Sequence, residues 1–333
     1  MQVLEKKYEL VTFDYLIDNK AWALPLLIWQ FFYLIYHLPN AVATVTLFGG
    51  YHSYLPTLLS KLFGKPSIVI LGGSDCVSFP SIGYGNFNNG LQGAFTRWSL
   101  NHASHISTVD ESLQKCEYLY TTTDLPWQGY KVFCPKATAP CTTIHFGYDA
   151  DHFHRVAEKT PNSFLTVGYL NPANYYRKGI DLIFDQAKRR PNCTYTIIGG
   201  TEKDLPNGVI KPENVTMLAS VSYSELVNHY SAHQFYFQLS MMEGFPSAIC
   251  EAMLCECIPI GSDVAAIPNI IGDTGFVLKQ KDVQLLDALI DQALESQDAD
   301  LGHEARKRIM QKYPVDEREK LATLVDSEIE RFQ

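Results

Sequence analysis

Two glutamates are the residues in this chain whose type and spacing point most directly to chemistry. Glu243 and Glu251 stand eight positions apart, and between them lies a turn of Gly244, Phe245, Pro246 and Ser247. An apolar run at residues 235–239 predicts a buried strand before the first glutamate, and a second run at residues 258–260 predicts another strand after the second. The stretch is therefore expected to form a strand, a loop, a helix and a strand.

The predicted helix start between these glutamates is suited to binding an anion. With Pro246 at the first helical position, the missing N–H costs nothing, and the N–H groups of Ser247 and Ala248 point out of the positive end of the helix dipole. Phosphate fits such a site, while Glu243 and Glu251 offer acceptors to sugar or ribose hydroxyls. The alternative is that Glu243 is a solvated loop residue and Glu251 an ordinary helix carboxylate, and the pair alone favours that interpretation.

A basic pair in the same half of the chain adds positive charge. Arg177 and Lys178 follow a predicted strand at residues 163–167 and precede a predicted helix that begins near Ile180. At the carboxyl edge of a sheet, paired cations would neutralise a diphosphate and assist its departure. Adjacent basic residues are also common on solvated surfaces, so it is their place after a glycine-ended strand, together with the glutamates, that favours binding.

Glycines end several predicted strands, at the sheet edge where doubly wound folds bind ligands. Gly168 follows the strand at residues 163–167. The strand at residues 195–198 leads into Gly199, Gly200 and Thr201, where a nucleotide base could lie against the backbone. In the first half, the strand at residues 67–71 leads into Gly72, Gly73, Ser74 and Asp75, where the backbone is expected to turn tightly beside a ligand.

Apolar strands and helices alternate along the whole chain, the pattern of parallel α/β sheets. In the first half, strands are predicted at residues 11–15, 43–48, 67–71, 106–109 and 142–145, and helices at residues 55–63, 91–103 and 111–119. In the second half, a further strand is predicted at residues 215–218, and helices at residues 222–233, 283–294 and 316–332.

One apolar segment allows two interpretations. Residues 21–36 carry no charge but include Pro25 and Gln30, and the run is shorter than the roughly 20 residues needed to span a bilayer. Our main interpretation is a helix buried against a sheet, and the alternative is a helix at a membrane interface.

Composition restricts the class of protein. A chain of 333 residues suits two domains, and its formal charge of −9 argues against nucleic-acid binding. Most of that charge lies in the second half, because residues 1–150 are nearly neutral. The eight cysteines form no C-x-x-C pair and are expected to be reduced thiols of a cytoplasmic protein. No metal-ligand spacing is present, so no metal site is expected, and no secretory signal is predicted.

The segment around the glutamates resembles a known family. It contains EGFPSAICEAM followed by CIPIGSDVAAIPNIIGDTGFVL, which resembles the glutamate-x7-glutamate signature of retaining GT-B glycosyltransferases, group 1 or family 4. The runs GGSD, SIGYG and IHFGYDADHF resemble further landmarks of that family. The resemblance implies two Rossmann-like doubly wound domains facing across a cleft, the first lacking its initial strand-helix unit. Residues 1–150 would form the acceptor-side domain and residues 151–333 the donor-binding domain, with the helix at about residues 316–332 crossing back.

The resemblance also implies roles for the residues above. Glu243, Lys178 and Arg177 would be catalytic, with the basic pair on the diphosphate and Glu243 on the transferred sugar. The remaining donor-binding positions would be Gly168, Gly199, Gly200, Thr201, Gly244, Phe245, Pro246, Ser247 and Glu251, the last on the ribose. The acceptor side would be formed by Gly72, Gly73, Ser74 and Asp75. Departures from the family pattern are Tyr169 in place of an arginine, Glu256 in place of a glycine and Asn269 in place of an acid.

The expected function is transfer of a sugar, with retention of configuration, from a nucleotide sugar to a glycan or lipid-linked acceptor in polysaccharide or glycoconjugate synthesis. The nucleoside-diphosphate sugar is a co-substrate, and neither a cofactor nor a metal is expected. We expect a cytoplasmic location, with the inner membrane face and peripheral membrane contact as alternatives. Two other functions fit the sequence, namely a non-catalytic nucleotide-sugar-binding scaffold and a nucleotide-sugar epimerase.

Overall fold

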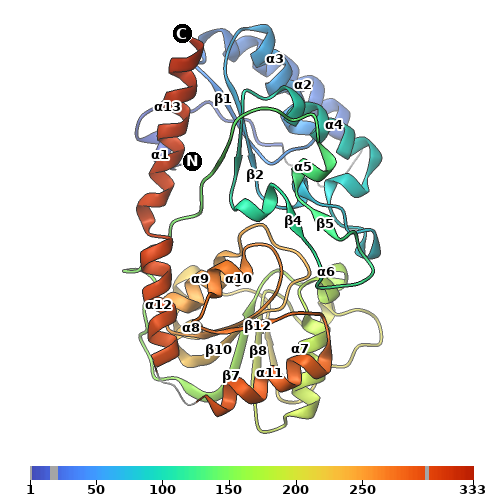
Figure 1. Ribbon diagram of the computed structural model, residues 1–333, viewed down its shortest axis with the longest axis vertical. Helices are drawn as coiled ribbons and strands as arrows, with labels where there is room; N and C mark the ends of the chain where they lie inside the picture. Colours follow the sequence, from blue (N-terminus) through green and yellow to red (C-terminus); the bar gives the residue numbers. More distant parts are fainter. Residues whose placement is uncertain (1, 16–21, 297–299) are drawn as a thin grey trace. The chain divides into compact units, whose positions relative to one another are not determined.

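The computed structural model describes residues 2–15, 22–296 and 300–333. The chain divides into two compact units, which are considered separately below (Figure 1). The first unit comprises Met1–Glu117, Asp124–His145 and Asp316–Gln333, and the second comprises Tyr118–Thr123 and Phe146–Val315. The main division therefore falls after His145, five residues before the expected boundary at residue 150.

A four-stranded parallel sheet forms the centre of the first unit. Its strands follow the order β1 (Thr44–Leu47), β2 (Ser67–Leu71), β3 (His105–Thr108) and β6 (Cys141–Thr143). The helices before and between the first three strands are α2 (Ala23–His37), α3 (Tyr51–Leu62) and α4 (Gly90–His102). Because the strands are added in one direction, right-handed connections place α3 and α4 on the same face, where they pack against each other while α2 packs on α3.

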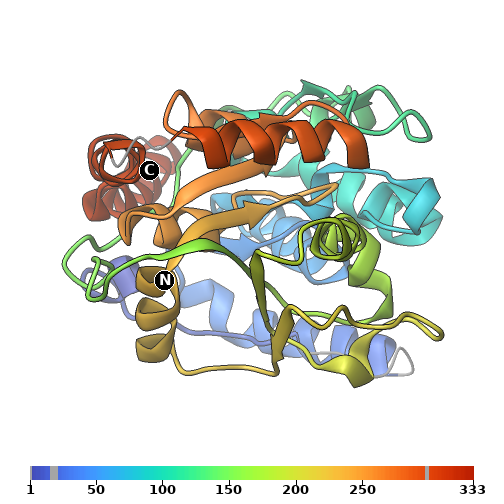
Figure 2. The same ribbon diagram turned by 90° about the horizontal axis from the view of Figure 1, so that it is seen from below.

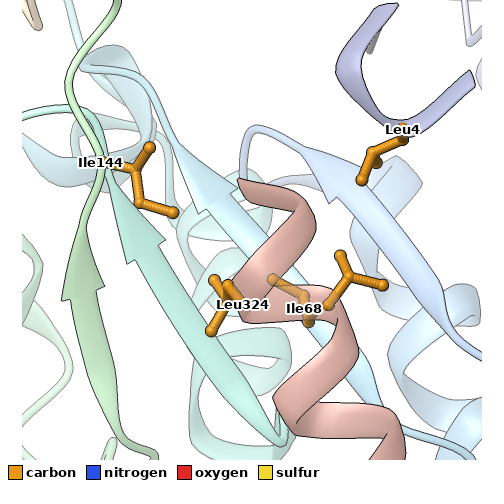
Figure 3. Close-up of a cluster of buried hydrophobic side chains, with 5 residues drawn as sticks. Leu4, Ile68, Ile144 and Leu324 are labelled. Carbon is orange, nitrogen blue, oxygen red and sulfur yellow. The ribbon is translucent and has the colours of Figure 1, made fainter. Parts of the chain in front are cut away.

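The opposite face of this sheet is covered from both ends of the chain. Helix α13 (Lys320–Phe332) packs with α1 (Gln2–Glu5), and Figure 3 shows Leu4, Ile68, Ile144 and Leu324 in one buried cluster. A buried polar contact adds to it, since His105 Nδ1 lies 3.0 Å from the Glu328 carboxylate. Residues 316–333 thus belong to the first unit.

Residues 11–15, expected as a strand, have no regular secondary structure. The prediction was wrong because the alternating apolar residues pack on a helix instead of pairing with a strand. The Phe13 ring lies 5.1 Å from the ring of Tyr33 in α2 at a tilt of 59°, and the Tyr33 hydroxyl donates to the Thr12 carbonyl at 2.7 Å.

The apolar helix α2 is present but is not buried against the sheet. It packs on α3, and most of its large side chains are exposed. Our main interpretation of this segment was therefore wrong; Ala21, which it included, lies outside the described residues. No described helix has the length and apolar character needed to cross a bilayer.

The expected helix at residues 111–119 is also corrected. Asp110 caps only a single 3-10 turn, Glu111–Leu113, by accepting from the Ser112 N–H. The chain then pairs as an antiparallel ribbon, β4 (Cys116–Glu117) with β5 (Trp127–Gln128), followed by the short helix α5 (Tyr130–Phe133).

A six-stranded parallel sheet forms the centre of the second unit. Its order is β12 (Phe276–Leu278), β11 (Ile258–Ser262), β10 (His233–Gln238), β7 (Thr160–Val167), β8 (Thr194–Ile198) and β9 (Val215–Leu218). Strands β8 and β9 follow β7 in sequence and lie on one side of it. The next strands in sequence, β10, β11 and β12, lie on its other side. This order is doubly wound, and it reverses direction between β7 and β10.

Helices cover both faces of this second sheet (Figure 2). In chain order they are α6 (Pro172–Arg177), α7 (Ile180–Arg189), α8 (Tyr223–Ala232), α9 (Ser247–Leu254), α10 (Ile267–Ile271), α11 (Val283–Glu295) and α12 (Asp300–Lys312). Helix α12 was not expected from the sequence. It packs on α9 and β11 and so helps to fix the segment that carries the two glutamates.

Candidate functional site

The reversal of strand order in the second unit brings the predicted donor residues together. Gly168 follows β7 directly, and Glu243 lies in the loop that follows β10, so both lie at the carboxyl ends of the two strands that flank the reversal. In doubly wound sheets this is the point where the connecting loops diverge to opposite faces and leave room for a ligand.

A lysine–glutamate ion pair lies at this point. The Lys178 ammonium is 2.5 Å from Glu243 Oε1, and the two side chains are only 20% and 14% exposed. The same oxygen accepts from the Ser240 hydroxyl at 2.7 Å and from Gln238 Nε2 at 3.2 Å. Within the described chain all of these bonds go to Oε1, which leaves Oε2 available to a ligand hydroxyl.

Burial and charge act in opposite directions on Glu243. Burial alone raises the pKa of this carboxyl, but the charge and hydrogen bond of Lys178, the Ser240 hydroxyl and the charge of Arg177 together bring the pKa below its ordinary value. Glu243 is therefore an ionised acceptor at neutral pH.

Arg177 is held by contacts with α6 and with the loop after β10. Its Nε donates to Asn174 Oδ1 at 2.9 Å, and its carbonyl accepts from the Met241 N–H at 2.7 Å. Gly179 permits this approach because its φ is +72° and a Cβ there would lie 2.5 Å from the Leu239 carbonyl oxygen. The α6–α7 turn and the loop after β10 are thus joined.

A third cation, which the sequence reasoning missed, supports this turn. Lys281, after β12, donates to the Tyr176 carbonyl at 3.0 Å and lies 2.8 Å from the Asp181 carboxylate. Burial raises the pKa of Asp181, and the Lys281 charge opposes that shift. The available signal was a lysine close behind the short apolar run at residues 276–278, which the sequence analysis did not assign to a strand.

Helix α9 begins beside the ion pair, one residue later than expected. Pro246 is the extended N-cap residue, and Ser247 is the first helical residue. The Ser247 hydroxyl accepts from the Tyr148 hydroxyl at 3.1 Å, and the buried Phe245 ring is stacked near Tyr148 and edge-on to Tyr313. Aromatic packing thus fixes the turn around the buried Gly244, with the N–H groups of the first helical turn at the open helix end.

Glu251 has a different environment from Glu243. Its Oε2 accepts from the Tyr230 hydroxyl at 3.0 Å, and burial raises the pKa of this carboxyl above its ordinary value, although the Tyr230 bond opposes the shift. The two glutamates therefore have different partners: Glu243 pairs with the Lys178 ammonium, and Glu251 bonds to the Tyr230 hydroxyl of α8.

The glycines after β8 are needed for close backbone packing. Gly199 has φ +118°, and a Cβ on it would lie 2.3 Å from the Gly168 carbonyl oxygen; a Cβ on Gly200 would clash with Leu170. Thr201 is tied into a capping box, since its hydroxyl donates to Asp204 Oδ2 at 3.0 Å. Gly199 thus brings the end of β8 against the end of β7.

In the first unit, Asp75 lies beneath the loops instead of facing outward. It is fully buried and accepts N–H bonds from Gly49 at 2.8 Å and from Gly72 and Gly73 at 3.2 and 2.8 Å. Burial raises the pKa of Asp75, and these backbone bonds oppose the shift. The carboxylate thus joins the loop after β1 to the loop after β2, and the neighbouring Ser74 is partly exposed.

Asp110 is a second carboxylate at the carboxyl edge of the first sheet, and its pairing with His145 was not predicted from the sequence. Asp110 Oδ2, after β3, lies 3.5 Å from His145 Nε2, after β6, and the His145 side chain is 24% exposed. Burial favours a raised pKa for Asp110, but the bonds from His145 and Ser112 outweigh it and lower the pKa. Adjacent parallel strands ending in Asp and His were visible in the sequence, but their pairing depended on the strand order.

No three or more His, Cys, Asp or Glu side chains within residues 2–15, 22–296 and 300–333 are grouped to hold a metal ion. Metal independence therefore stays a prediction.

These features define a GT-B-like fold, with two Rossmann-like α/β units and the candidate ligand-binding side chains at the strand-order reversal of the second. Residues 148–312, which lie within the second unit, match the family model Glycosyl transferases group 1.

One relative is similar to this chain over much of its length. The gpi3 subunit of phosphatidylinositol N-acetylglucosaminyltransferase from Schizosaccharomyces pombe is 24% identical over 264 residues, covering 71% of this chain and 56% of that protein. The chain thus corresponds to little more than half of that relative's length.

Solved structures share the fold at low sequence identity. Sucrose-phosphate synthase from Thermosynechococcus elongatus superposes with a TM-score of 0.74 at 15% identity, covering 94% of this chain and 80% of that one. HepE from Anabaena, solved with UDP and glucose, gives a TM-score of 0.65 at 15% identity, covering 94% and 84%. At this identity the likeness establishes the fold.

Proposed function

We propose that this protein is a retaining glycosyltransferase that moves a sugar from a nucleoside-diphosphate sugar to a glycan or lipid-linked acceptor in glycoconjugate or polysaccharide synthesis. The observation that carries the proposal is the ion pair between Lys178 and Glu243, which lies at the strand-order reversal and beside the start of α9. A charged carboxylate, a cation and open N–H groups together match the hydroxyls and phosphates of such a donor.

The reaction follows from these groups. The bond between the anomeric carbon and the diphosphate oxygen breaks, and Lys178 and Arg177 stabilise the departing negative charge. The acceptor oxygen attacks from the same face, and its proton passes to the departing phosphate, so configuration is retained. Glu243 accepts from hydroxyls of the transferred sugar, which orients the anomeric carbon. This route uses no protein nucleophile, cofactor or metal.

The nucleotide occupies the rest of the same strand edge. Glu251 accepts from the ribose hydroxyls, and the base lies over the backbone of Gly199 and Gly200. The close packing of Gly199 on the end of β7 supports this placement, because it brings the backbone of two strand ends together at this edge. In the first unit, Gly72, Gly73 and Ser74 are proposed to contact the acceptor, and Asp75 positions them from beneath.

The acceptor is proposed to be lipid-linked or a glycan. The name of the Schizosaccharomyces pombe relative includes phosphatidylinositol, a lipid, which supports a lipid-borne acceptor here. The proposal includes peripheral contact with the inner membrane face by a cytoplasmic protein.

A second function, nucleotide-sugar binding without transfer, is favoured by one observation. Tyr169 stands at the end of β7, where the family is expected to carry an arginine, and its side chain is 72% exposed. A site with one cation fewer would stabilise the departing diphosphate less.

The test is an equilibrium and turnover measurement with a panel of UDP-, GDP- and ADP-sugars. Each donor is first screened by thermal shift, since a ligand of the folded state raises the midpoint. Transfer and donor hydrolysis are then measured, and NMR of the product's anomeric proton reports retention. Lys178→Met and Glu243→Gln should each lower turnover at least 100-fold, of the order seen when one transition-state donor is removed.

The matched control is Lys279→Met, which removes a lysine that is 71% exposed in the same unit. It should leave turnover unchanged. Donor stabilisation without transfer or hydrolysis would select the binding function, and near-normal turnover in both site variants would refute the assignment of the site.

A further inference from the structure

The outward face of α2 carries large apolar side chains that the protein leaves exposed. Its exposed large side chains range from 39% to 77% exposed and are Leu24, Ile28, Trp29, Phe31, Phe32, Ile35 and Tyr36. Trp22, just before the helix, is 63% exposed. An apolar area of this kind on a folded unit marks a surface that contacts something else.

The spacing shows that these side chains form one stripe. Positions 24, 28, 31 and 35 follow one another at intervals of three and four residues, as do 25, 29, 32 and 36, so they share a face of the helix. The other side holds the one fully buried residue of α2, Gln30, whose Nε2 donates to the His52 carbonyl in α3 at 2.9 Å. This bond and partly buried side chains such as Leu27 and Leu34 attach α2 to its own unit, and the apolar stripe faces away.

Charge in the part of the chain that forms α2, α3 and α4 is mainly basic, although the exposed Asp14, whose charge adds to burial in raising the pKa of Tyr33 in α2, lies near this helix. From Trp22 to Val109 the only acidic residue is Asp75, which is fully buried. The same stretch carries Lys61, Lys65 and Arg97, of which Lys61 and Arg97 are exposed. In a chain with a formal charge of −9, the α2–α3–α4 layer of the first unit (Figure 1) is therefore neutral to basic at its surface.

The end of α3 extends the same combination. Leu62 is 71% exposed and Phe63 is 39% exposed, and both directly follow the exposed Lys61. Apolar side chains beside lysines, without acidic neighbours in the sequence, are complementary to a binding partner with an apolar interior and a negatively charged boundary.

We propose that the outer face of α2 lies in the headgroup region of an anionic lipid bilayer, with the helix parallel to the membrane surface. This inference names the surface behind the membrane contact in the proposed function and rests on that function. Helix α2 has 15 residues, fewer than the roughly 20 that span a bilayer, so it rests on the membrane. Trp29 and Tyr36 are the residue types that settle at the water–lipid boundary.

Two properties favour a bilayer over a second copy of the chain. A two-fold interface uses the same patch twice and would add like charge to like charge, whereas anionic headgroups attract an exposed lysine such as Lys61. The proposed lipid-linked acceptor also requires the acceptor-side unit to reach a membrane surface, and this unit carries α2.

The experiment is flotation of the full chain with vesicles of phosphatidylcholine alone or containing 30% phosphatidylglycerol, without donor or acceptor. The wild-type protein should float with anionic vesicles, and its tryptophan emission should shift to the blue and be quenched by brominated lipid, an effect that Trp29→Ser should reduce. The double variant Trp29→Ser with Phe32→Ser should reduce bound protein at least tenfold. Both positions are exposed, so circular dichroism should be unchanged.

Ile210→Ser is the matched control, since Ile210 is 81% exposed in the second unit; it should float like the wild type. Lys61→Gln with Lys65→Gln should weaken binding to anionic vesicles, as should added salt. Failure of the wild type to float, or flotation unchanged by the double variant, would overturn the proposal. So would a concentration-dependent dimer that the double variant abolishes, which would make the face an interface between copies.

Turnover with a water-soluble acceptor separates this inference from the proposed function. If the double variant keeps that turnover and loses flotation, both proposals stand. If the wild type floats but transfers no sugar to any acceptor, the surface assignment stands and the proposed function fails.

Discussion

The ion pair between Lys178 and Glu243 makes a prediction that requires no knowledge of the donor. Removing one partner of a largely buried, hydrogen-bonded charge pair costs about 2–5 kcal/mol. At 20% and 14% exposure, with Ser240 and Gln238 still bonded to the carboxylate, we take the lower end, about 2 kcal/mol. Each of Lys178→Met and Glu243→Gln should therefore destabilise the second unit by about that amount.

The double variant should lose about 2 kcal/mol as well, not 4, because the second substitution removes a group whose partner is already gone. For a unit of this size, 1 kcal/mol lowers the melting midpoint by about 2–4 °C, so each variant should melt about 4–8 °C lower. The coupling energy between Lys178 and Glu243 is obtained from the unfolding free energies of the wild type, the two single variants and the double variant.

The assay benefits from the position of the tryptophans. All four, Trp22, Trp29, Trp98 and Trp127, belong to the first unit, so their fluorescence reports its unfolding, while far-UV circular dichroism reports both units. The dichroism transition should shift, and the fluorescence transition should not. Single-variant costs that add within about 0.5 kcal/mol would refute the coupling.

The pH dependence has a definite sign. The pKa of Glu243 is lowered in the folded protein, so its contribution is present above the unfolded-state value of about 4.3 and is lost as pH falls through the folded pKa. The stability difference between the wild type and Glu243→Gln should thus be full at pH 7 and should shrink in acid below about pH 4.3.

Two further predictions concern the first unit. Asp75→Asn places an amide N–H₂ opposite backbone N–H groups such as that of Gly49, and should destabilise this unit by about 2–3 kcal/mol, measured by urea unfolding followed by tryptophan fluorescence; an unchanged midpoint would contradict the bracing role. Glu328→Gln removes a buried, charged partner of His105 and should cost about 1–2 kcal/mol, with faster hydrogen exchange in α13; exchange equal to wild type would show that this contact does not secure the helix.

The elements of the second unit were largely predictable because local pattern and final environment agree there. Strands such as β8 and β10 carry apolar runs bounded by turns, and the capping box of Ser222 with Glu225 marks the start of α8. The candidate donor residues were chosen because several of them follow predicted strands, which end at one edge of a parallel sheet, and because their segments resemble a known family.

The first unit was less predictable because its sequence signals compete with tertiary contacts. Phe13 has the alternation of a strand but packs on a helix. Helix α2 has the apolarity of a core element but exposes its stripe, and no local signal tells a buried apolar helix from an exposed one. Contacts such as Lys281 with Asp181 or Asp110 with His145 depend on strand order, which periodicity does not encode.

The position of residues 316–333 in the first unit affects how this chain is made. The core around Ile68 is closed by Leu324, yet a ribosome must first translate the 170 residues from Phe146 to Val315. At about 5–20 residues per second this takes roughly 10–30 s. During that interval the sheet surface that α13 will cover stays open, while the second unit can already complete its fold. The apolar sheet surface of the first unit is thus exposed to solvent for longer during synthesis than that of the second unit.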